Sequence, residues 1–235
     1  MNPDLEALKD LQASDTRIAG LEAEVARLPR QIEAIQAALA DARKAVETLK
    51  ARMETTKKDL RAKEKDLEVV AAKRSKSEAR LYEVKTNKEY SAVLVEIEEI
   101  KQEKARTEEE ILSLMELGEG LSVDVREAEA RLGTRETEAR GDEAVIRQKL
   151  AAAENELGVV RAERASRARD VARPLLGDYE KILRARGGLA VVPVTTTAVC
   201  GGCRMAIRPQ ALQELRAATG LVHCENCGRY LYWQE

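Results

Sequence analysis

Apolar residues recur at every seventh position through most of the first 84 residues of the chain. One series consists of Leu11, Ile18, Val25, Ile32, Leu39, Val46, Met53, Leu60, Leu67 and Leu81. A second series, offset by three residues, consists of Leu21, Leu28, Ile35, Ala42, Leu49, Val70 and Val84. Two such series form one apolar stripe on an α-helix, so the pattern predicts a long helix that packs in a coiled coil. Polar residues replace apolar ones at positions 56, 63, 74 and 77, where we expect looser packing.

Pro29 lies within the first part of this pattern. A proline inside a helix removes one amide donor, and its ring crowds the preceding turn. We therefore expect a kink or a short break in the helix near residues 28–29.

A second helical pattern begins near Tyr90 and extends to about Val160. The segment between the two patterns, residues 84–90, contains Asn87, which readily adopts turn conformations, and either Thr86 or Asn87 can cap the following helix. The apolar residues are arranged roughly symmetrically about this segment. We therefore expect the chain to turn near residues 85–89 and the two helices to run antiparallel.

The distribution of charge also favours an antiparallel hairpin. Residues 50–88 carry 13 basic and 7 acidic side chains, whereas residues 89–143 carry 7 basic and 17 acidic ones. Residues 1–49 are net acidic and residues 144–188 net basic. A hairpin turning near residue 87 places opposite charges together at both ends, whereas a parallel pair of chains in register places like charges together. Exposed ion pairs contribute only roughly 0.2–1 kcal/mol each, so they select the register more than they stabilise it.

The composition agrees with long helices, because 35% of the residues are charged, only 3% are aromatic and Phe is absent. The formal net charge of -2 gives no overall basic field that would favour nucleic acid or a membrane. We see no leader-like pattern at the first residues and no apolar run of the roughly 20 residues that a membrane span needs. We therefore expect a cytoplasmic protein without a membrane span.

Pro174 and the pair Gly187-Gly188 bound a short amphipathic segment, since proline favours helix starts and glycine helix ends. We predict a mainly α fold in three parts. Residues 1–172 form a long antiparallel coiled-coil hairpin, residues 173–188 a connecting helix, and residues 189–235 a small β-rich tail.

All four cysteines of the chain lie in this tail as two C-x-x-C pairs, Cys200 with Cys203 and Cys224 with Cys227. Two pairs at this spacing can place four thiolates around one Zn²⁺, which is the usual closed structural site. A redox or disulfide pair is the alternative, but the βαβ context of a thioredoxin-like motif is missing. We expect a zinc ribbon with one structural Zn²⁺, whose binding supplies much of the folding energy of the tail.

The sequence offers no candidate catalytic residues. The single histidine, His223, could replace one zinc ligand, but four cysteines already satisfy the metal and a surface role is the simpler interpretation. A closed four-thiolate site leaves no position for an activated water. We therefore expect a protein that is not an enzyme and that has no small-molecule substrate.

Arginines and aromatic residues near the metal are candidates for contacts with RNA or DNA. They are Arg161, Arg164, Arg167, Arg169, Arg173, Arg204, Arg208, Arg229, Tyr230, Tyr232 and Trp233. Two alternatives remain open at this stage. The arginines could instead pair with acidic residues near the N-terminus, and the aromatic residues could form the core of the ribbon.

The chain resembles the bacterial C4-type zinc ribbon family. The resemblance rests on residues 84–90 (VKTNKEY), on the Tyr179-Glu180 segment, and on the two knuckles, CGGC at 200–203 and CENCGRYLY at 224–232. It implies a helical hairpin followed by a ribbon, and no enzymatic activity. Because a long helical rod presents faces to other proteins, we expect an adaptor, with a passive spacer as the alternative. The resemblance further implies a protein partner, such as an alternative sigma factor or a component of flagellar or type III secretion assembly, or contacts with mRNA. Glu225 stands where such knuckles often have proline, a difference that leaves the ligands unchanged.

Overall fold

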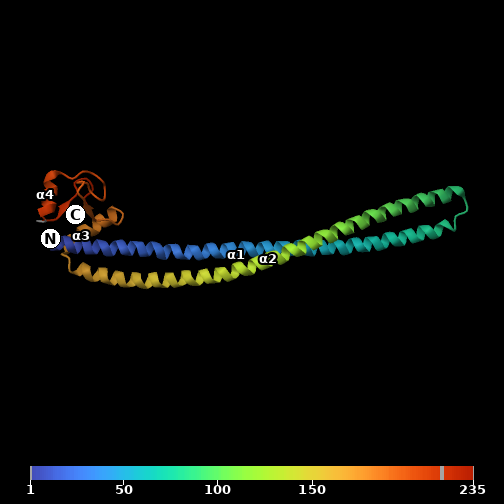
Figure 1. Cartoon of the computed structure of the whole chain (residues 1–235), viewed down its shortest axis with the longest axis horizontal. Coiled ribbons are helices and arrows are strands. Elements are labelled where there is room, and N and C mark those ends of the chain that lie inside the picture. The colour runs from blue at the N-terminus through green and yellow to red at the C-terminus, as the bar shows by residue number, and fades with distance from the viewer. Residues whose placement is uncertain (1, 218–219, 235) are drawn as a thin grey trace. The chain divides into compact units, whose positions relative to one another are not determined.

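The computed structural model describes residues 2–217 and 220–234 of the chain. Two long helices, α1 (Pro3–Leu81) and α2 (Asn87–Arg169), contain most of these residues and are joined by a short loop (Figure 1). The remaining elements are α3 (Arg173–Ala185), β1 (Val191–Val194), α4 (Pro209–Ala217), β2 (Val222–His223) and β3 (Tyr230–Trp233). The fold is mainly α with a small C-terminal sheet, as predicted.

The apolar stripe of α1 is the face that this helix buries. All heptad positions between Leu11 and Val84 are buried or partly buried, including the polar residues Thr56 and Ser77. On α2, residues such as Ile97, Leu121 and Val125 are buried at the matching spacing. The two helices run antiparallel, so the coiled-coil hairpin predicted from the sequence is confirmed.

Opposite charges on the two helices form ion pairs along the seam. These pairs include Arg17–Glu156, Arg161–Glu22, Arg43–Glu136, Lys50–Glu129, Lys63–Glu110 and Arg80–Glu96. Most of the side chains in them are substantially exposed, so each pair adds little stability. The opposite charges predicted to meet in an antiparallel hairpin therefore do meet, and they select its register.

The turn between the two helices ends in a capping box at the start of α2. The hydroxyl oxygen of Thr86 accepts a hydrogen bond from the Glu89 amide (3.2 Å), and the Glu89 carboxylate accepts one from the Thr86 amide (3.2 Å). The Thr86 hydroxyl also donates to this carboxylate at 2.8 Å, and these hydrogen bonds lower the pKa of Glu89. Of the two candidate caps in the sequence, Thr86 is the one that the structure uses.

A break near residues 28–29 does not occur, because α1 runs without interruption through Pro29. Proline costs one intrahelical hydrogen bond, but Leu28 beside it is only 2% exposed and anchors the helix in the seam. In a helix of 79 residues, packing on both sides of the proline holds the chain in the helical conformation.

The chain divides into two compact units by its contacts. The terminal unit contains the chain up to Glu33 and from Glu143 onward, and the central unit contains Ala34–Asp142. The boundaries expected after residues 172 and 188 both fall inside the terminal unit. The ribbon therefore belongs to the same compact unit as the ends of the two long helices.

One hydrophobic core of the terminal unit joins α1, α3 and the sheet. Leu8 and Leu11 of α1 pack in a cluster with Tyr179 of α3, Val191 of β1 and Tyr230 of β3, and all five are less than 5% exposed. A second cluster contains the buried side chains around the cysteines, including Val194 and Leu231. Because Val191 and Tyr230 belong to the ribbon's own sheet, the ribbon cannot complete its packing without α1 and α3.

Two polar side chains of α1 also tie α3 and β1 to this core. The buried amide of Gln12 accepts hydrogen bonds from the backbone amides of Ala190 (2.6 Å) and Val191 (3.0 Å), and donates to the carbonyl of Gly188 (2.8 Å). Asp15 accepts a hydrogen bond from the hydroxyl of Tyr179 at 2.7 Å. Burial and the Asp15 carboxylate raise the pKa of Tyr179 well above its usual value, so this phenol stays protonated.

The three strands form a sheet in the order β1-β3-β2. β1 pairs parallel with β3, bringing Val191 opposite Tyr230, and β2 pairs antiparallel with β3. β1 leads into the first cysteine pair, and β3 follows the second pair. Because these two strands are paired, the sheet connects both halves of the cysteine site to the core.

Candidate metal centre

The first cysteine pair lies in a tight turn after β1. The carbonyl of Cys200 accepts a hydrogen bond from the amide of Arg204 at 2.8 Å, and the amide of Gly201 donates to the carbonyl of Pro193 at 2.9 Å. A side chain at Gly201 would place its Cβ 2.7 Å from that carbonyl oxygen. Glycine is therefore required here for close backbone approach rather than for an unusual backbone angle.

The second pair repeats the geometry of the first. The carbonyl of Cys224 accepts a hydrogen bond from the amide of Gly228 at 2.7 Å. Gly228 has a φ of +75° and Arg204, at the same place in the first turn, has a φ of +60°. The residue after each C-x-x-C thus adopts the left-handed conformation, which costs Arg204 more than Gly228.

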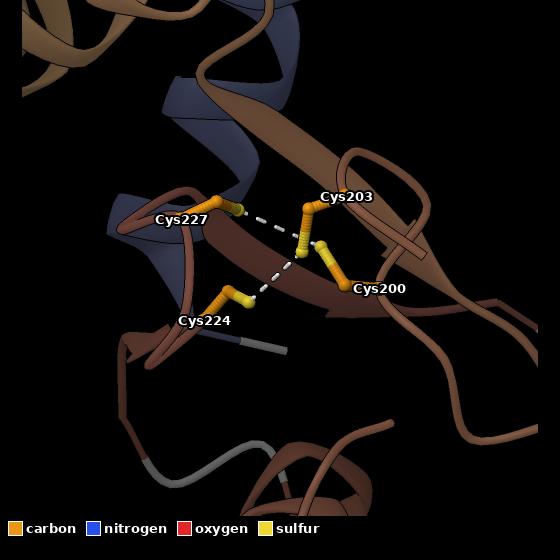
Figure 2. A group of neighbouring side chains, drawn as sticks. All are labelled: Cys200, Cys203, Cys224 and Cys227. Atoms are coloured by element: carbon orange, nitrogen blue, oxygen red, sulfur yellow. Dashed lines mark hydrogen bonds between the residues drawn. The ribbon is translucent and has the colours of Figure 1, made fainter. Parts of the chain in front are cut away.

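The four cysteine sulfurs converge on one point (Figure 2). Their Sγ atoms all lie within 4.8 Å of one another, with 3.8 Å between Cys200 and Cys227 and 3.7 Å between Cys203 and Cys224. These distances are too long for disulfide bonds. They match the roughly 3.8 Å edge of a tetrahedron with Zn–S bonds of about 2.3 Å. The donor set and its geometry fit one structural Zn²⁺, as predicted from the spacing.

Burial and hydrogen bonds affect the thiols differently. Burial raises the pKa of Cys200 to about 12 and also raises that of Cys224. A hydrogen bond from the Asn226 side chain lowers the pKa of Cys203 to about 6. Because Zn²⁺ binds thiolates, it supplies the charge that stabilises the deprotonated form of the buried cysteines, and its binding releases protons.

Two arginines fix the second cysteine turn to the end of α3. Arg186 donates from Nε to the carbonyl of Cys227 at 2.8 Å. Arg229 donates to the carbonyls of Leu189 (2.7 Å) and Arg186 (2.9 Å), and a Cβ at Gly202 would lie 2.7 Å from its Cδ. Arg229, a candidate for nucleic-acid contact, thus holds backbone carbonyls beside the metal site.

Several other candidate arginines bond within the terminal unit. Arg164 pairs with Asp15 and Glu180, Arg161 pairs with Glu22, and Arg167 donates to the carbonyl of Asp10 and the hydroxyl of Ser14. Arg208 pairs with Glu225 in the second cysteine turn. Pairing with acidic residues near the N-terminus was the alternative left open by the sequence, and Asp15 is one of these partners.

Three candidate arginines, Arg169, Arg173 and Arg204, remain exposed, and among the residues that the structure describes their side chains form no ion pair or hydrogen bond. They are therefore the candidate arginines whose charges no described partner occupies.

The three candidate aromatic residues lie on β3. Tyr230 is buried, and its hydroxyl donates to Asp178 at 2.7 Å. The Lys9 ammonium lies 5.0 Å from the centre of the Tyr232 ring, and the Arg216 guanidinium lies 4.4 Å from the Trp233 ring. Tyr230 therefore belongs to the core, whereas Tyr232 and Trp233 are partly covered by cations of the same chain.

His223 lies outside the sulfur cluster. Its side chain is exposed, its ring packs 4.1 Å from the ring of Tyr230, and Nδ1 lies 3.2 Å from the carbonyl of Gly228. The four sulfurs form a complete ligand set without it.

Sequence reasoning did not predict the contacts that attach the site to the hairpin, which are made by Gln12, Asp15, Asp178, Tyr179 and Arg186. Their partners lie 41–179 residues away or are backbone atoms, so no local motif marks them. Gln12 follows the heptad position Leu11 but belongs to neither apolar series, so the heptad pattern does not mark it.

The fold and the site together define a coiled-coil hairpin protein with a C4 zinc ribbon. A family model described as "CT398-like coiled coil hairpin domain" matches residues 11–188, and one described as "C4-type zinc ribbon domain" matches residues 199–231. The chain therefore belongs to the family of proteins with a CT398-like coiled-coil hairpin and a C-terminal C4-type zinc ribbon.

Solved structures show the same fold. The structure of CT398 from Chlamydia trachomatis is 26% identical with a TM-score of 0.82, and the match covers 100% of both chains. A protein from Mycobacterium smegmatis is 20% identical with a TM-score of 0.70, again over 100% of both chains. The HP0958 protein from Helicobacter pylori is 18% identical with a TM-score of 0.64, over 99% of this chain and 98% of that one. The comparison with curated proteins gave no match.

The helices of the described residues can be compared with the requirements of a membrane span. None of these helices combines the length and the apolar character needed to span a bilayer.

Proposed function

We propose that the protein is a non-enzymatic cytoplasmic adaptor that binds a protein partner through its coiled coil and uses the zinc ribbon as a structural element. The closed ligand set supports the absence of metal-assisted hydrolysis, because four thiolates leave no coordination position for water. On the resemblance in the sequence, we propose as partner an alternative sigma factor or a component of flagellar or type III secretion assembly. The role that goes with such a partner is the regulation of gene expression.

The observation that carries this proposal is the uneven exposure of apolar residues on the hairpin. Of 13 large hydrophobic residues that are exposed in the described structure, nine lie on α2 and only Val69 lies on α1. Three of the nine, Leu112, Met115 and Val123, lie within 12 residues of one another and, at about 100° per residue, on one side of the helix. Scattered exposed apolar residues are ordinary, but a one-sided cluster on a helix marks a binding surface.

A pull-down from native lysate, with and without nuclease, tests this proposal. We expect a protein partner that survives nuclease treatment and is lost when Leu112 and Val123 are both replaced by serine. Val145→Ser combined with Val159→Ser, also at exposed positions of α2, should leave capture unchanged. Recovery of nothing, or only of material that nuclease removes, would refute the adaptor role.

A second candidate function is binding of RNA or DNA by the ribbon and its neighbouring arginines. It is favoured by the exposure of Arg169, Arg173 and Arg204, which the internal ion pairs of the terminal unit leave available. A fluorescence-anisotropy titration of labelled RNA against salt tests it. Replacing the three arginines by glutamine should reduce the slope of log K against log salt by about 2, whereas Arg131→Gln in the central unit should not. Absence of affinity at low salt would exclude this function.

A further inference from the structure

The seam of the central unit contains an apolar pocket at the one place where a glycine occupies a heptad position of α2. The pocket has a volume of about 280 Å³. It is lined by Met53, Thr56 and Leu60 of α1 and by Leu114, Met115 and Gly118 of α2, together with the polar residues Lys57, Glu119 and Ser122. The pocket exists because neither Gly118 nor Thr56 supplies the large side chain that a coiled-coil seam normally contains.

The space at Gly118 is open towards the pocket. A Cβ built there would meet only the methyl group of Thr56, at 4.0 Å, which is ordinary van der Waals contact. The pocket can therefore admit one bulky apolar side chain, such as Leu, Met or Phe, from outside the hairpin. An apolar pocket that accepts one anchor side chain is the usual centre of a protein-binding site.

The rim of the pocket is apolar along α2. Leu112, Met115 and Val123, which lie on one side of α2, are 61%, 46% and 45% exposed. They continue the apolar surface from the pocket onto the outer side of α2, so a helix laid along α2 would bury them together with its anchor.

The charged residues around the pocket indicate that the partner is positively charged. Between residues 108 and 129, α2 carries eight acidic side chains and one basic one. Glu109, Glu116, Glu119 and Asp124 form no ion pair among the residues that the structure describes. On the opposite wall, the Lys57 ammonium is already paired with Glu54 at 2.9 Å. A partner helix along α2 therefore meets unpaired carboxylates and needs basic residues to complement them.

We propose that this pocket and the adjoining face of α2 bind a basic amphipathic helix of a protein partner, which inserts one bulky apolar side chain beside Gly118. The inference rests on the proposed adaptor function and specifies the site and the chemistry of the partner.

A pair of glycine variants tests the proposal in the full-length, zinc-loaded protein. Gly118→Leu fills the pocket, whereas Gly120→Leu adds the same side chain at an exposed helical position with nothing within 4 Å. Both changes replace a helical glycine by a better helix former, so both proteins should fold, and circular dichroism checks this. A second variant, Glu116→Gln with Glu119→Gln, removes two exposed charges, one of them on the lining of the pocket, without changing an apolar side chain.

The probe is a labelled synthetic helix of about 18 residues, long enough to be helical, with lysines along one side and a central leucine. We expect it to bind, and we expect Gly118→Leu and a probe with alanine for the leucine each to weaken binding by about tenfold or more. Gly120→Leu should leave affinity within about twofold of the wild-type value. The double glutamine variant should weaken binding and reduce its salt dependence, and a probe with glutamates for lysines should not bind.

Equal affinity in wild type and Gly118→Leu, equal binding of the acidic probe, or no binding of the basic probe would overturn the proposal. A dimer in sedimentation that Gly118→Leu dissociates would also overturn it, because the occupant would then be a second copy of the chain. A nuclease-resistant partner that Gly118→Leu still captures would refute the pocket while leaving the adaptor function intact. Failure of the wild-type protein to capture any partner would refute the adaptor function itself.

Discussion

Gln12 lies beside the apolar stripe of α1 and is only 8% exposed. Gln12 connects α1 to the start of β1 by three hydrogen bonds. Its amide oxygen accepts hydrogen bonds from the backbone amides of Ala190 and Val191, and its amide nitrogen donates one to the carbonyl of Gly188. These backbone groups lie where the chain enters β1. A polar residue in a helix is therefore essential to the attachment of the ribbon.

Gln12→Ala should destabilise the terminal unit by about 2–4 kcal/mol, since it leaves two buried amides without acceptors. Denaturation followed by the fluorescence of Trp233, the only tryptophan, measures this loss. Gln36→Ala, at an exposed position of the same helix, provides the control and should change stability by less than about 0.5 kcal/mol. Equal effects of the two changes would mean that Gln12 does not anchor β1.

At the scale of elements, the sequence predicted the hairpin well because heptad spacing, charge and turn residues are local signals that all favour the same structure. The cysteine spacing predicted the metal site for the same reason. The sequence predicted a kink or a short break at Pro29 and could not decide between them, since the continuity of α1 depends on packing of Leu28 rather than on the proline itself. The parallel pairing of β1 with β3 and the role of Arg229 were also missed, because they depend on contacts between distant segments.

The capping box at the start of α2 allows a test of one element alone. Thr86→Ala removes the acceptor for the Glu89 amide and should cost about 1 kcal/mol. Hydrogen exchange at the first turns of α2 should report the loss. Thr55→Ala is the matched control, because the Thr55 hydroxyl bonds only to the carbonyl of Ala51 within α1, and this change should not lower stability. Unchanged protection in Thr86→Ala would show that the turn is fixed by other contacts.

At the scale of the whole molecule, the ribbon and the ends of the long helices form one compact unit rather than two separate domains. Val191 and Tyr230 of the sheet and Leu8 and Leu11 of α1 share the same core, so the metal site stabilises more than the tail that contains it. The central unit has its own seam and no residue in that core.

Removal of zinc should therefore affect the chain unevenly. Cys203→Ser, or a chelator, should abolish hydrogen-exchange protection in the ribbon and lower it in α3 and in the first turns of α1, while residues 40–140 keep theirs. Cys203 is the least buried of the four cysteines, so serine there removes a ligand with little loss of packing. Full protection of the first turns of α1 after zinc loss would contradict a shared core.

The central claim is that one Zn²⁺ is held by four thiolates in a closed, non-catalytic site. Zinc-edge X-ray absorption of the purified protein, with the metal content determined on the same sample, tests it most directly. We predict one zinc per chain and four sulfur neighbours at about 2.3 Å. A nitrogen or oxygen neighbour at about 2.0–2.1 Å would contradict the account, because it would place His223 or water on the metal and reopen the possibility of catalysis.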